Sequence, residues 1–364
     1  MHAMQIFRRI SGLVAARGDL VFDLGPCDEP IETIAGIETR THIVLGASAA
    51  RSILTDEARF APAPIAESIR RLSEHTGIDA TAIHRFLTHN PMQTDRPAHA
   101  TLRRSYASAY AHSLRRHARQ LRDVASTHFA QLERHRPTAL ARDVIAPGVD
   151  AILQILLSDD DIAVEWIERI GGGAAMLEYL HHPRKLAAKS AQLQAFLDDF
   201  ASRCGESASD PVREAIISSY VLQGREPIVG AIGAFLHNWL SIPPEAREHQ
   251  LDSIDAAQLF AHTAPVNYIG RNARVDTHVA GHHIVAGDHL LLMLPWINGD
   301  AIARGQRTMA FGAGAHACAG QALALALTDA FLDGLRDNHS RIDWSAVECE
   351  PPVAGVFRQY GSHP

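Results

Sequence analysis

The stretch from Phe311 to Gly320 carries the most informative chemistry in this sequence. It reads FGAGAHACAG and places two glycines shortly before a single cysteine. Gly312 and Gly314 can adopt the left-handed backbone angles that a sharp loop needs. The run QALALAL that follows favours a helix, so Cys318 is expected where a helix begins. Free N–H groups and the positive end of the helix dipole stabilise a thiolate at that place, which points to a metal ligand.

Two alternatives to a metal ligand are open for this segment. Gly312-x-Gly314 matches half of a dinucleotide-binding fingerprint, but the third glycine and the downstream acidic residue are missing. Cys318 could also be an inert cysteine in a core. The complete pattern favours the metal ligand over both alternatives.

The segment resembles the haem-binding signature of the cytochrome P450 family, Phe-Gly-x-Gly-x-His-x-Cys-x-Gly, at every specified position. The resemblance implies that haem b (iron protoporphyrin IX) is the cofactor and that Cys318 is its proximal thiolate ligand. It also implies that His316 reaches a haem propionate and that Phe311 packs beside the sulfur. The cofactor-binding residues implied by this loop are Phe311, Gly312, Gly314, His316, Cys318 and Gly320.

Four upstream pieces are similar to other characteristic parts of the same family. The run DRPAHATLRR contains His99 and Arg103, which lie four residues apart and hence on one helix face. The resemblance implies that both donate to a propionate, although a basic surface helix would show the same pattern. Arg271, which follows an Ala-Pro-Val stretch, is the third implied propionate donor. Segments 286–288 and 298–300 match two family turns that are expected between Arg271 and the cysteine loop.

One departure from the family pattern concerns a buried ion pair. The helix that should carry Glu-x-x-Arg reads Gln258-Leu259-Phe260-Ala261, so both charged residues are replaced. Losing one partner would leave an unpaired buried charge, whereas losing both can be nearly neutral. The loop between Asp300 and Phe311 is short as well. We therefore expect apolar packing where the ion pair would be.

A second departure lies in the long central helix, expected over residues 211–240. The family's Ala-Gly-x-Glu/Asp-Thr stretch is matched best by Gln223-Gly224-Arg225-Glu226-Pro227. Proline lacks an N–H and collides with the carbonyl four residues back, so the helix is expected to open there. Compared with the family pattern, Glu226 keeps the acid and Pro227 replaces the threonine with its hydroxyl. The resemblance implies that this loss argues against ordinary dioxygen activation.

The three candidate catalytic residues follow from this departure. Glu226 is the candidate proton-handling group and Arg225 the candidate anion-binding partner, while Pro227 replaces the threonine. Peroxide-using relatives carry Arg-Pro here, so the order Arg-Glu-Pro moves the arginine by one residue, about 100° around a helix. A surface ion pair between Arg225 and Glu226 is the alternative.

Composition limits the other classes of function. The 364-residue chain has a formal net charge of -7, which argues against general nucleic-acid binding. Its four cysteines are scattered, so neither a zinc knuckle nor a disulfide framework is expected. The 22 histidines are scattered too and are expected to be mostly structural or exposed. No membrane span or signal peptide is expected, and we predict a cytoplasmic protein.

The expected fold is mainly α with small β-sheets, a shortened cytochrome P450 fold in a single domain over 1–364. Helical patterning dominates 81–240, with breaks at 147–148, 171–173 and 183, and short strands are expected at 41–46 and 278–288. Substrate contacts are expected around 60–86 and near 229–230.

The combined expectation is a cytochrome P450-type oxidoreductase, or monooxygenase, that oxidises a small organic molecule in a biosynthetic tailoring step. The alternatives are a peroxide-driven or non-monooxygenase haem enzyme and a non-catalytic haem or ligand-binding protein. An electron-donating ferredoxin or flavodoxin is a possible partner. Its docking site would be a basic helix face formed by Arg103, Arg104, Arg115, Arg116, Arg119 and Arg122.

Overall fold

The computed structural model describes residues 9, 12–13, 24–35, 39–135, 137–158, 162, 164–170, 183–204, 210–349, 352–353 and 359–360. The chain divides into two compact units. The sheet unit comprises Met1–Ala63, Ala257–Cys318 and Ala354–Arg358, and the helical unit comprises Pro64–Ala256, Ala319–Val353 and Gln359–Pro364.

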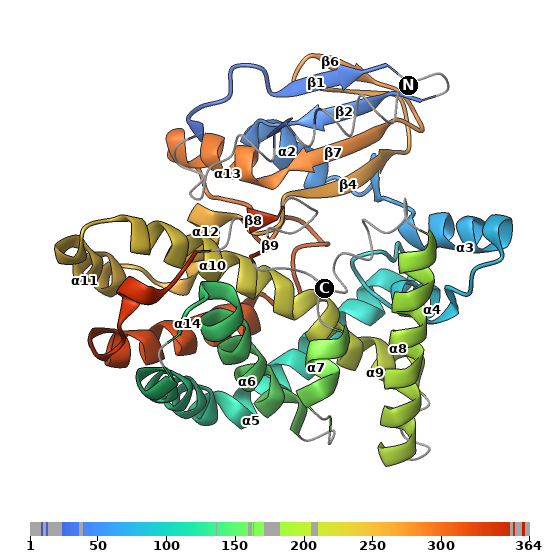
Figure 1. Ribbon diagram of the computed structural model, residues 1–364. Coiled ribbons are helices and arrows are strands. Elements are labelled where there is room, and N and C mark those ends of the chain that lie inside the picture. The colour runs from blue at the N-terminus through green and yellow to red at the C-terminus, as the bar shows by residue number, and fades with distance from the viewer. Residues whose placement is uncertain are drawn as a thin grey trace. The chain divides into compact units, whose positions relative to one another are not determined.

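The sheet unit is built on a five-stranded sheet of order β1-β2-β7-β4-β3. Strands β2 and β7 pair in parallel, and the other pairs are antiparallel. The blue β2 and the orange β7, which are far apart in the sequence, therefore lie side by side (Figure 1). The strands are β1 (Ile31–Ile34), β2 (Thr41–Val44), β3 (Phe60–Pro62), β4 (Tyr268–Ala273) and β7 (His289–Met293). A separate hairpin joins β5 (Thr277–Val279) to β6 (His282–Ile284), and the helices are α2 (Ala47–Leu54), α12 (Ala256–Thr263) and α13 (Leu294–Ala303).

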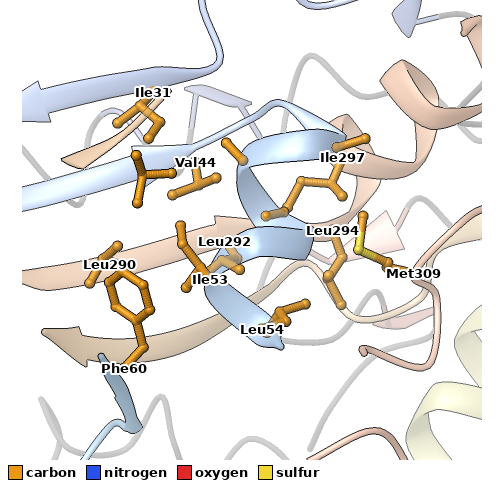
Figure 2. Packing of buried hydrophobic residues seen from close by; sticks show 14 of the residues in the cluster. Ile31, Val44, Ile53, Leu54, Phe60, Leu290, Leu292, Leu294, Ile297 and Met309 are labelled. Carbon is orange, nitrogen blue, oxygen red and sulfur yellow. The ribbon is translucent and has the colours of Figure 1, made fainter. Parts of the chain in front are cut away.

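The core of the sheet unit forms where α2 packs on the sheet. The sequence THIV of β2 is β-branched in part and buried along its whole length, as expected for a strand covered on both faces. Figure 2 shows Ile53 of α2 beside Leu292 of β7, in the buried cluster that also contains Leu54 and Leu290. Phe60 is 2 % exposed and belongs to this core. The expectation of substrate contacts around 60–86 and near 229–230 stays a prediction, and within the first of these segments the Phe60 ring belongs to apolar packing.

Two buried aspartates brace the sheet unit. Asp288 accepts hydrogen bonds from the Arg40 and Val285 amides and contacts the His42 ring at 2.9 Å. Asp300 accepts from the amides of Cys27 and Ala47. Burial alone would raise both pKa values, but these bonds lower the pKa of Asp288 to about 2 and hold that of Asp300 below its usual range.

The helical unit contains most of the helices and one short strand pair. Its helices are α3 (Ile65–Thr76), α4 (Thr81–Thr88), α5 (Ala98–His135), α6 (Ala146–Leu157), α7 (Val164–Ile170), α8 (Pro183–Cys204), α9 (Pro211–Ser219), α10 (Glu226–Ser241), α11 (Pro244–Ser253) and α14 (Gln321–Asn338). Its π-helical turns are η2 (Leu140–Ile145) and η6 (Tyr220–Arg225). Two 3-10 turns, η7 (His339–Arg341) and η8 (Trp344–Ala346), and the pair β8 (Pro352–Val353) with β9 (Gln359–Tyr360) complete it.

Helices α5 and α14 pack closely in the helical unit. A Cβ on Gly334 of α14 would lie 3.0 Å from the carbonyl oxygen of Ala125 and 3.0 Å from the ring of Phe129 in α5. The missing side chain lets the two backbones approach, and Phe129 then meets Phe331 edge-on at 4.9 Å. This packing holds the helix that follows the cysteine loop.

The predicted mainly helical class with small sheets is confirmed. The strand predicted at 41–46 is β2, and the one at 278–288 corresponds to the hairpin β5–β6. Helix boundaries occur near 147 and at 183, whereas the break predicted at 171–173 lies outside the described residues. The single domain over 1–364 stays a prediction.

Candidate functional site

The cysteine loop runs from Phe311 to Gly320 and leads into α14. The Cys318 amide donates to the Phe311 carbonyl at 2.9 Å, and the Ala317 amide donates to Gly314 at 3.2 Å. The Cys318 side chain is exposed. Gly320 is the N-cap of α14. The structure therefore presents this cysteine just ahead of a helix, as the sequence predicts.

Two glycines of the loop have the left-handed backbone that the sequence analysis assigns to them. Gly312 has φ 72° and Gly314 has φ 71°. A Cβ on Gly314 would lie 2.3 Å from the carbonyl oxygen of Leu54, at the end of α2. Backbone atoms cannot yield as a flexible side chain can, so this position needs glycine for space as well as for conformation.

Hydrogen bonds from α13 and α2 anchor the residues before the loop. The Asn298 side-chain oxygen accepts from the Met309 amide at 2.7 Å, and Gly312 donates to the Met309 carbonyl at 2.9 Å. Arg51 donates to the Arg307 carbonyl at 2.6 Å. These contacts give a structural role to Asn298, which the sequence alone marks only as part of a turn.

Apolar packing occupies α12, where the family pattern would carry an ion pair. Phe260 is 2 % exposed, and its ring lies 4.7 Å from that of Phe311. Gln258, at the position of the expected glutamate, is exposed. The ring contact links α12 directly to the cysteine loop, whereas the exposed Gln258 shows that apolar packing does not fill the position of the expected glutamate.

Arg271 is a buried cation in β4 of the sheet unit. It is 8 % exposed, and Nη1 donates to the Gly270 carbonyl at 2.8 Å. In the part of the chain that the structure describes, no carboxylate pairs with it, and burial lowers its pKa to about 10. A buried guanidinium in this state is suited to an anionic group of a ligand.

His99 and Arg103 lie in the first turns of α5 in the helical unit. His99 is 4 % exposed and Arg103 is half-buried, on the shared helix face that their spacing predicts. His316 is half-buried in the cysteine loop of the sheet unit. The structure thus brings His316, Cys318 and Phe311 together in one loop and places Arg271 in the same unit.

These residues fit a haem-thiolate group. The exposed Cys318 offers a sulfur ligand, and the Gly314 turn leaves no room for a side chain. The buried Arg271 is a cation suited to a propionate. The thiol and the guanidinium match the two kinds of group that a thiolate-ligated haem uses, a sulfur ligand for the iron and a cation for a propionate.

The candidate catalytic residues form a buried charge network in the helical unit. Arg225 binds Asp150 of α6 through Nε at 2.6 Å and Nη2 at 2.8 Å. Its Nη1 donates to Glu226 at 2.8 Å. The side chains of Asp150, Arg225 and Glu226 are 7 %, 14 % and 3 % exposed. The alternative of a surface pair is therefore wrong in its location, because the pair is buried.

Asp150 is a member of the network that sequence reasoning missed. It lies 75 positions from Arg225, so no local pattern connects them. The one sequence feature that could have pointed to Asp150 is its place as a single acidic residue at the otherwise apolar start of a helix, Pro147-Gly148-Val149-Asp150. Burial lowers the pKa of Lys189 in α8. The nearby Glu226 acts in the opposite direction on this pKa.

The network determines what Arg225 is able to bind. Burial alone would lower its pKa, but the hydrogen bonds and charges of Asp150 and Glu226 raise it. Two carboxylates already occupy three guanidinium nitrogens. This arrangement makes Arg225 a structural cation and leaves little capacity for a further anion.

The central helical run opens ahead of Pro227, as predicted. Residues 220–225 form the π-helical turn η6, and α10 then begins with proline in its first turn. Gln223 in this turn accepts from the Asn90 side chain at 2.8 Å. Pro227 contributes no hydroxyl and no N–H to this turn.

Comparison with solved structures identifies the fold. CYP109E1 from Bacillus megaterium, in complex with testosterone, has a TM-score of 0.71 at 16 % identity and covers 92 % of this chain and 93 % of its own. P450BioI, in complex with an acyl carrier protein ligated to hexadec-9Z-enoic acid, has a TM-score of 0.71 at 15 % identity, covering 90 % and 93 %. HmtN, a post-tailoring hydroxylase of himastatin biosynthesis, has a TM-score of 0.68 at 18 % identity, covering 96 % and 97 %.

The chain has the cytochrome P450 fold, which agrees with the resemblance of its motifs. No protein-family model and no curated protein matches the sequence. No helix among the described residues is both long and apolar enough to cross a bilayer.

We expect Gly314→Ala to damage the cysteine loop far more than Gly305→Ala. Both glycines are left-handed, with φ 71° and 63°, but nothing lies within 4 Å of a Cβ on Gly305. Backbone strain alone should cost about 1 kcal/mol at Gly305, and the overlap with Leu54 should raise the cost at Gly314 to about 3 kcal/mol. Urea unfolding of the two variants measures this difference. Equal losses would contradict the close approach to Leu54.

We expect Arg225→Gln to lower the free energy of unfolding by about 3 kcal/mol, because two buried carboxylates would lose their cation. Exposed Arg115 provides the control, and Arg115→Gln should change stability by less than about 0.5 kcal/mol. Chemical unfolding of the haem-loaded proteins is the measurement. A variant at position 225 that unfolds at the wild-type midpoint would show that the network contributes little.

Proposed function

We propose that this protein is a haem-thiolate oxidoreductase that oxidises a small organic molecule in a biosynthetic tailoring step. The observation that carries the proposal is the exposed Cys318 at the end of a glycine loop and ahead of α14, in a chain with the cytochrome P450 fold. The similar structure of HmtN, a post-tailoring hydroxylase, supports this kind of reaction. A fold alone does not select a substrate, so the proposal stops at the class of reaction.

In this proposal Cys318 ligates the iron of haem b, and the cation of Arg271 binds a propionate. His99, Arg103 and His316 are the further propionate donors, with Phe311, Gly312, Gly314 and Gly320 shaping the loop around the sulfur. Bound haem supplies the redox chemistry. The protein supplies the ligand, holds the charges of the propionates and controls protons near the substrate.

Proton control is assigned to Glu226 and its neighbours. Glu226 is 3 % exposed, follows the π-helical turn and bonds to Arg225 through one carboxylate oxygen. Arg225 orients the Glu226 carboxylate through this bond, and Asp150 holds Arg225 in place through two bonds. Glu226 can then accept and return a proton, while Pro227 provides no hydroxyl to share that role.

A second candidate function is a haem reaction that does not activate dioxygen, such as peroxide-driven oxidation or rearrangement of an oxidised substrate. The observation that favours it is Pro227 at the threonine position, because that hydroxyl normally helps to deliver protons. The engagement of Arg225 by Asp150 and Glu226 argues against a carboxylate substrate gripped by this arginine.

A ferredoxin or flavodoxin is the electron donor in the first candidate function. Helix α5 carries an arginine-rich face, and positions 104, 115, 116, 119 and 122 are exposed. Arg122 also pairs with Asp333 of α14 at 2.7 Å, which reduces the charge at that end of the face. An acidic partner would be steered to the remaining arginines.

We expect Cys318→Ala to abolish thiolate ligation. After reduction and exposure to carbon monoxide, the wild-type protein should give the red-shifted Soret band typical of a thiolate-ligated haem, and the variant should not. Cys27→Ala is the control, because the half-buried Cys27 donates to the Glu29 carbonyl at 3.0 Å outside the loop. A red-shifted band that persists in Cys318→Ala would overturn the proposed ligand.

We expect Glu226→Gln to reduce turnover about 100-fold at equal haem occupancy, since a positioned proton carrier contributes on this order. Oxygen consumption with a surrogate ferredoxin and its reductase, and guaiacol oxidation by hydrogen peroxide, separate the two candidate functions. Glu214→Gln is the matched control, because Glu214 is a buried glutamate of α9 paired with Arg85. Unchanged turnover would remove Glu226 from the mechanism, and inactivity of the wild type in both assays would favour a non-catalytic haem protein.

A further inference from the structure

The hairpin β5–β6 of the sheet unit has a tight two-residue turn. Ala280 has φ 49° and Gly281 has φ 82°, so both residues of the two-residue loop are left-handed. This is the pattern of a type I′ turn, whose twist matches that of the flanking strands. Val279 pairs with His282 next to the turn, and His278 pairs with His283 one step further on. The turn therefore sets the register of the two histidines.

His278 and His283 point to solvent from adjacent strands. In a hairpin closed by two residues, the pair next to the turn is hydrogen-bonded and the following pair is not. Side chains of a non-hydrogen-bonded pair are the closer ones, with Cβ atoms about 4.5–5.5 Å apart. Both histidines are exposed, whereas Val279 and Ile284 on the opposite face are 4 % and 0 % exposed. The buried face fixes the direction of the imidazoles.

The two imidazole rings stack with their nitrogens available. Their centroids are 4.9 Å apart and their planes differ by 28°. Among the described residues, neither ring forms a hydrogen bond or an ion pair. His289 differs, because its Nδ1 lies 3.2 Å from the Asn272 side-chain oxygen. The exposed histidines of this unit are thus not equivalent, and only the hairpin pair places two unengaged imidazoles side by side in the part of the chain that is described.

We propose that His278 and His283 form a binding site for a divalent transition-metal ion. Neutral imidazole is a preferred ligand for Zn²⁺, Cu²⁺ and Ni²⁺, with metal–nitrogen distances of about 2.0–2.1 Å for zinc. Two stacked rings on this hairpin need only side-chain rotation to direct one nitrogen each at the same ion. The strand register supplies the close approach that a flexible segment would have to form at an entropic cost.

The surroundings define which ions the site accepts. No group of three or more histidine, cysteine, aspartate or glutamate side chains is arranged for a metal among the described residues, so the pair is the whole protein contribution. Water completes the coordination. A site of two nitrogens disfavours Mg²⁺ and Ca²⁺, which prefer oxygen ligands, and the order of affinity should be Cu²⁺ above Ni²⁺ and Zn²⁺.

Nearby charges leave the exposed face accessible to a cation. Arg59 donates to the Thr277 hydroxyl at 2.8 Å and is paired with Asp56. Asp276, one residue before the hairpin, is exposed and accepts from the Ala286 amide. The site lies within the sheet unit and uses none of the residues assigned to haem. Its existence is therefore independent of the proposed function.

Calorimetric titration of ZnCl₂ into metal-free, haem-loaded protein tests the site. Because the second imidazole binds at a high effective concentration, His278→Ala and His283→Ala should each weaken the tightest Zn²⁺ site at least about tenfold. His289→Ala is the matched control and should bind Zn²⁺ as the wild type does. MgCl₂ should give no heat from this site. Equal Zn²⁺ affinity in all four proteins, or loss of affinity in the control alone, would overturn the proposal.

Chemical modification gives a second readout that maps the ion to its ligands. Diethyl pyrocarbonate modifies accessible imidazoles, and peptide mass spectrometry reports each histidine separately. Zn²⁺ should slow the modification of His278 and His283 but not that of exposed His112 on α5. Unprotected hairpin histidines would contradict the site even if the titration showed binding elsewhere on the chain.

Discussion

The approach of Gly314 to the Leu54 carbonyl is the constraint on which the proposed cofactor chemistry depends. It joins the end of α2 to the cysteine loop at a distance that excludes a side chain. Asn298 anchors Met309 just before the loop, and the Phe260 ring contacts Phe311 at its start. These contacts come from three different helices of one unit and restrain the loop that carries Cys318.

Apolar packing and buried charge are divided between different parts of this protein. At the two positions of α12 where the family pattern has an ion pair, this chain has Gln258 and Ala261, so no desolvated charge has to be compensated there. Charge is concentrated around Arg225, where Asp150 and Glu226 share one guanidinium, and around Asp288 and Asp300 in the sheet unit. In each place hydrogen bonds accompany the buried charge. This is the condition under which such charges are tolerated.

The π-helical turn η6 explains how the helical run accommodates Pro227, where the family pattern has a threonine. The helical run is widened at residues 220–225, and proline then starts α10 without needing an N–H partner. The carboxylate of Glu226 is retained next to this opening, while the hydroxyl of a threonine is not. In the proposed function, the carboxylate of Glu226 and any bound water therefore handle protons without a threonine hydroxyl.

Local residue patterns determined the parts of this protein that depend on neighbours in sequence. The glycine turn before Cys318, the shared face of His99 and Arg103, the opening before Pro227 and the strand at Thr41 all follow from backbone preferences and helix or strand periodicity. Tertiary structure alone decided which distant groups meet. Among the described residues, it paired Arg225 with Asp150, placed Leu54 against Gly314, buried Phe60 in the sheet core and left Arg271 without a carboxylate. Periodicity specifies the direction of a side chain from its own element, but contact and burial depend on how separate elements pack, which no short stretch of sequence encodes.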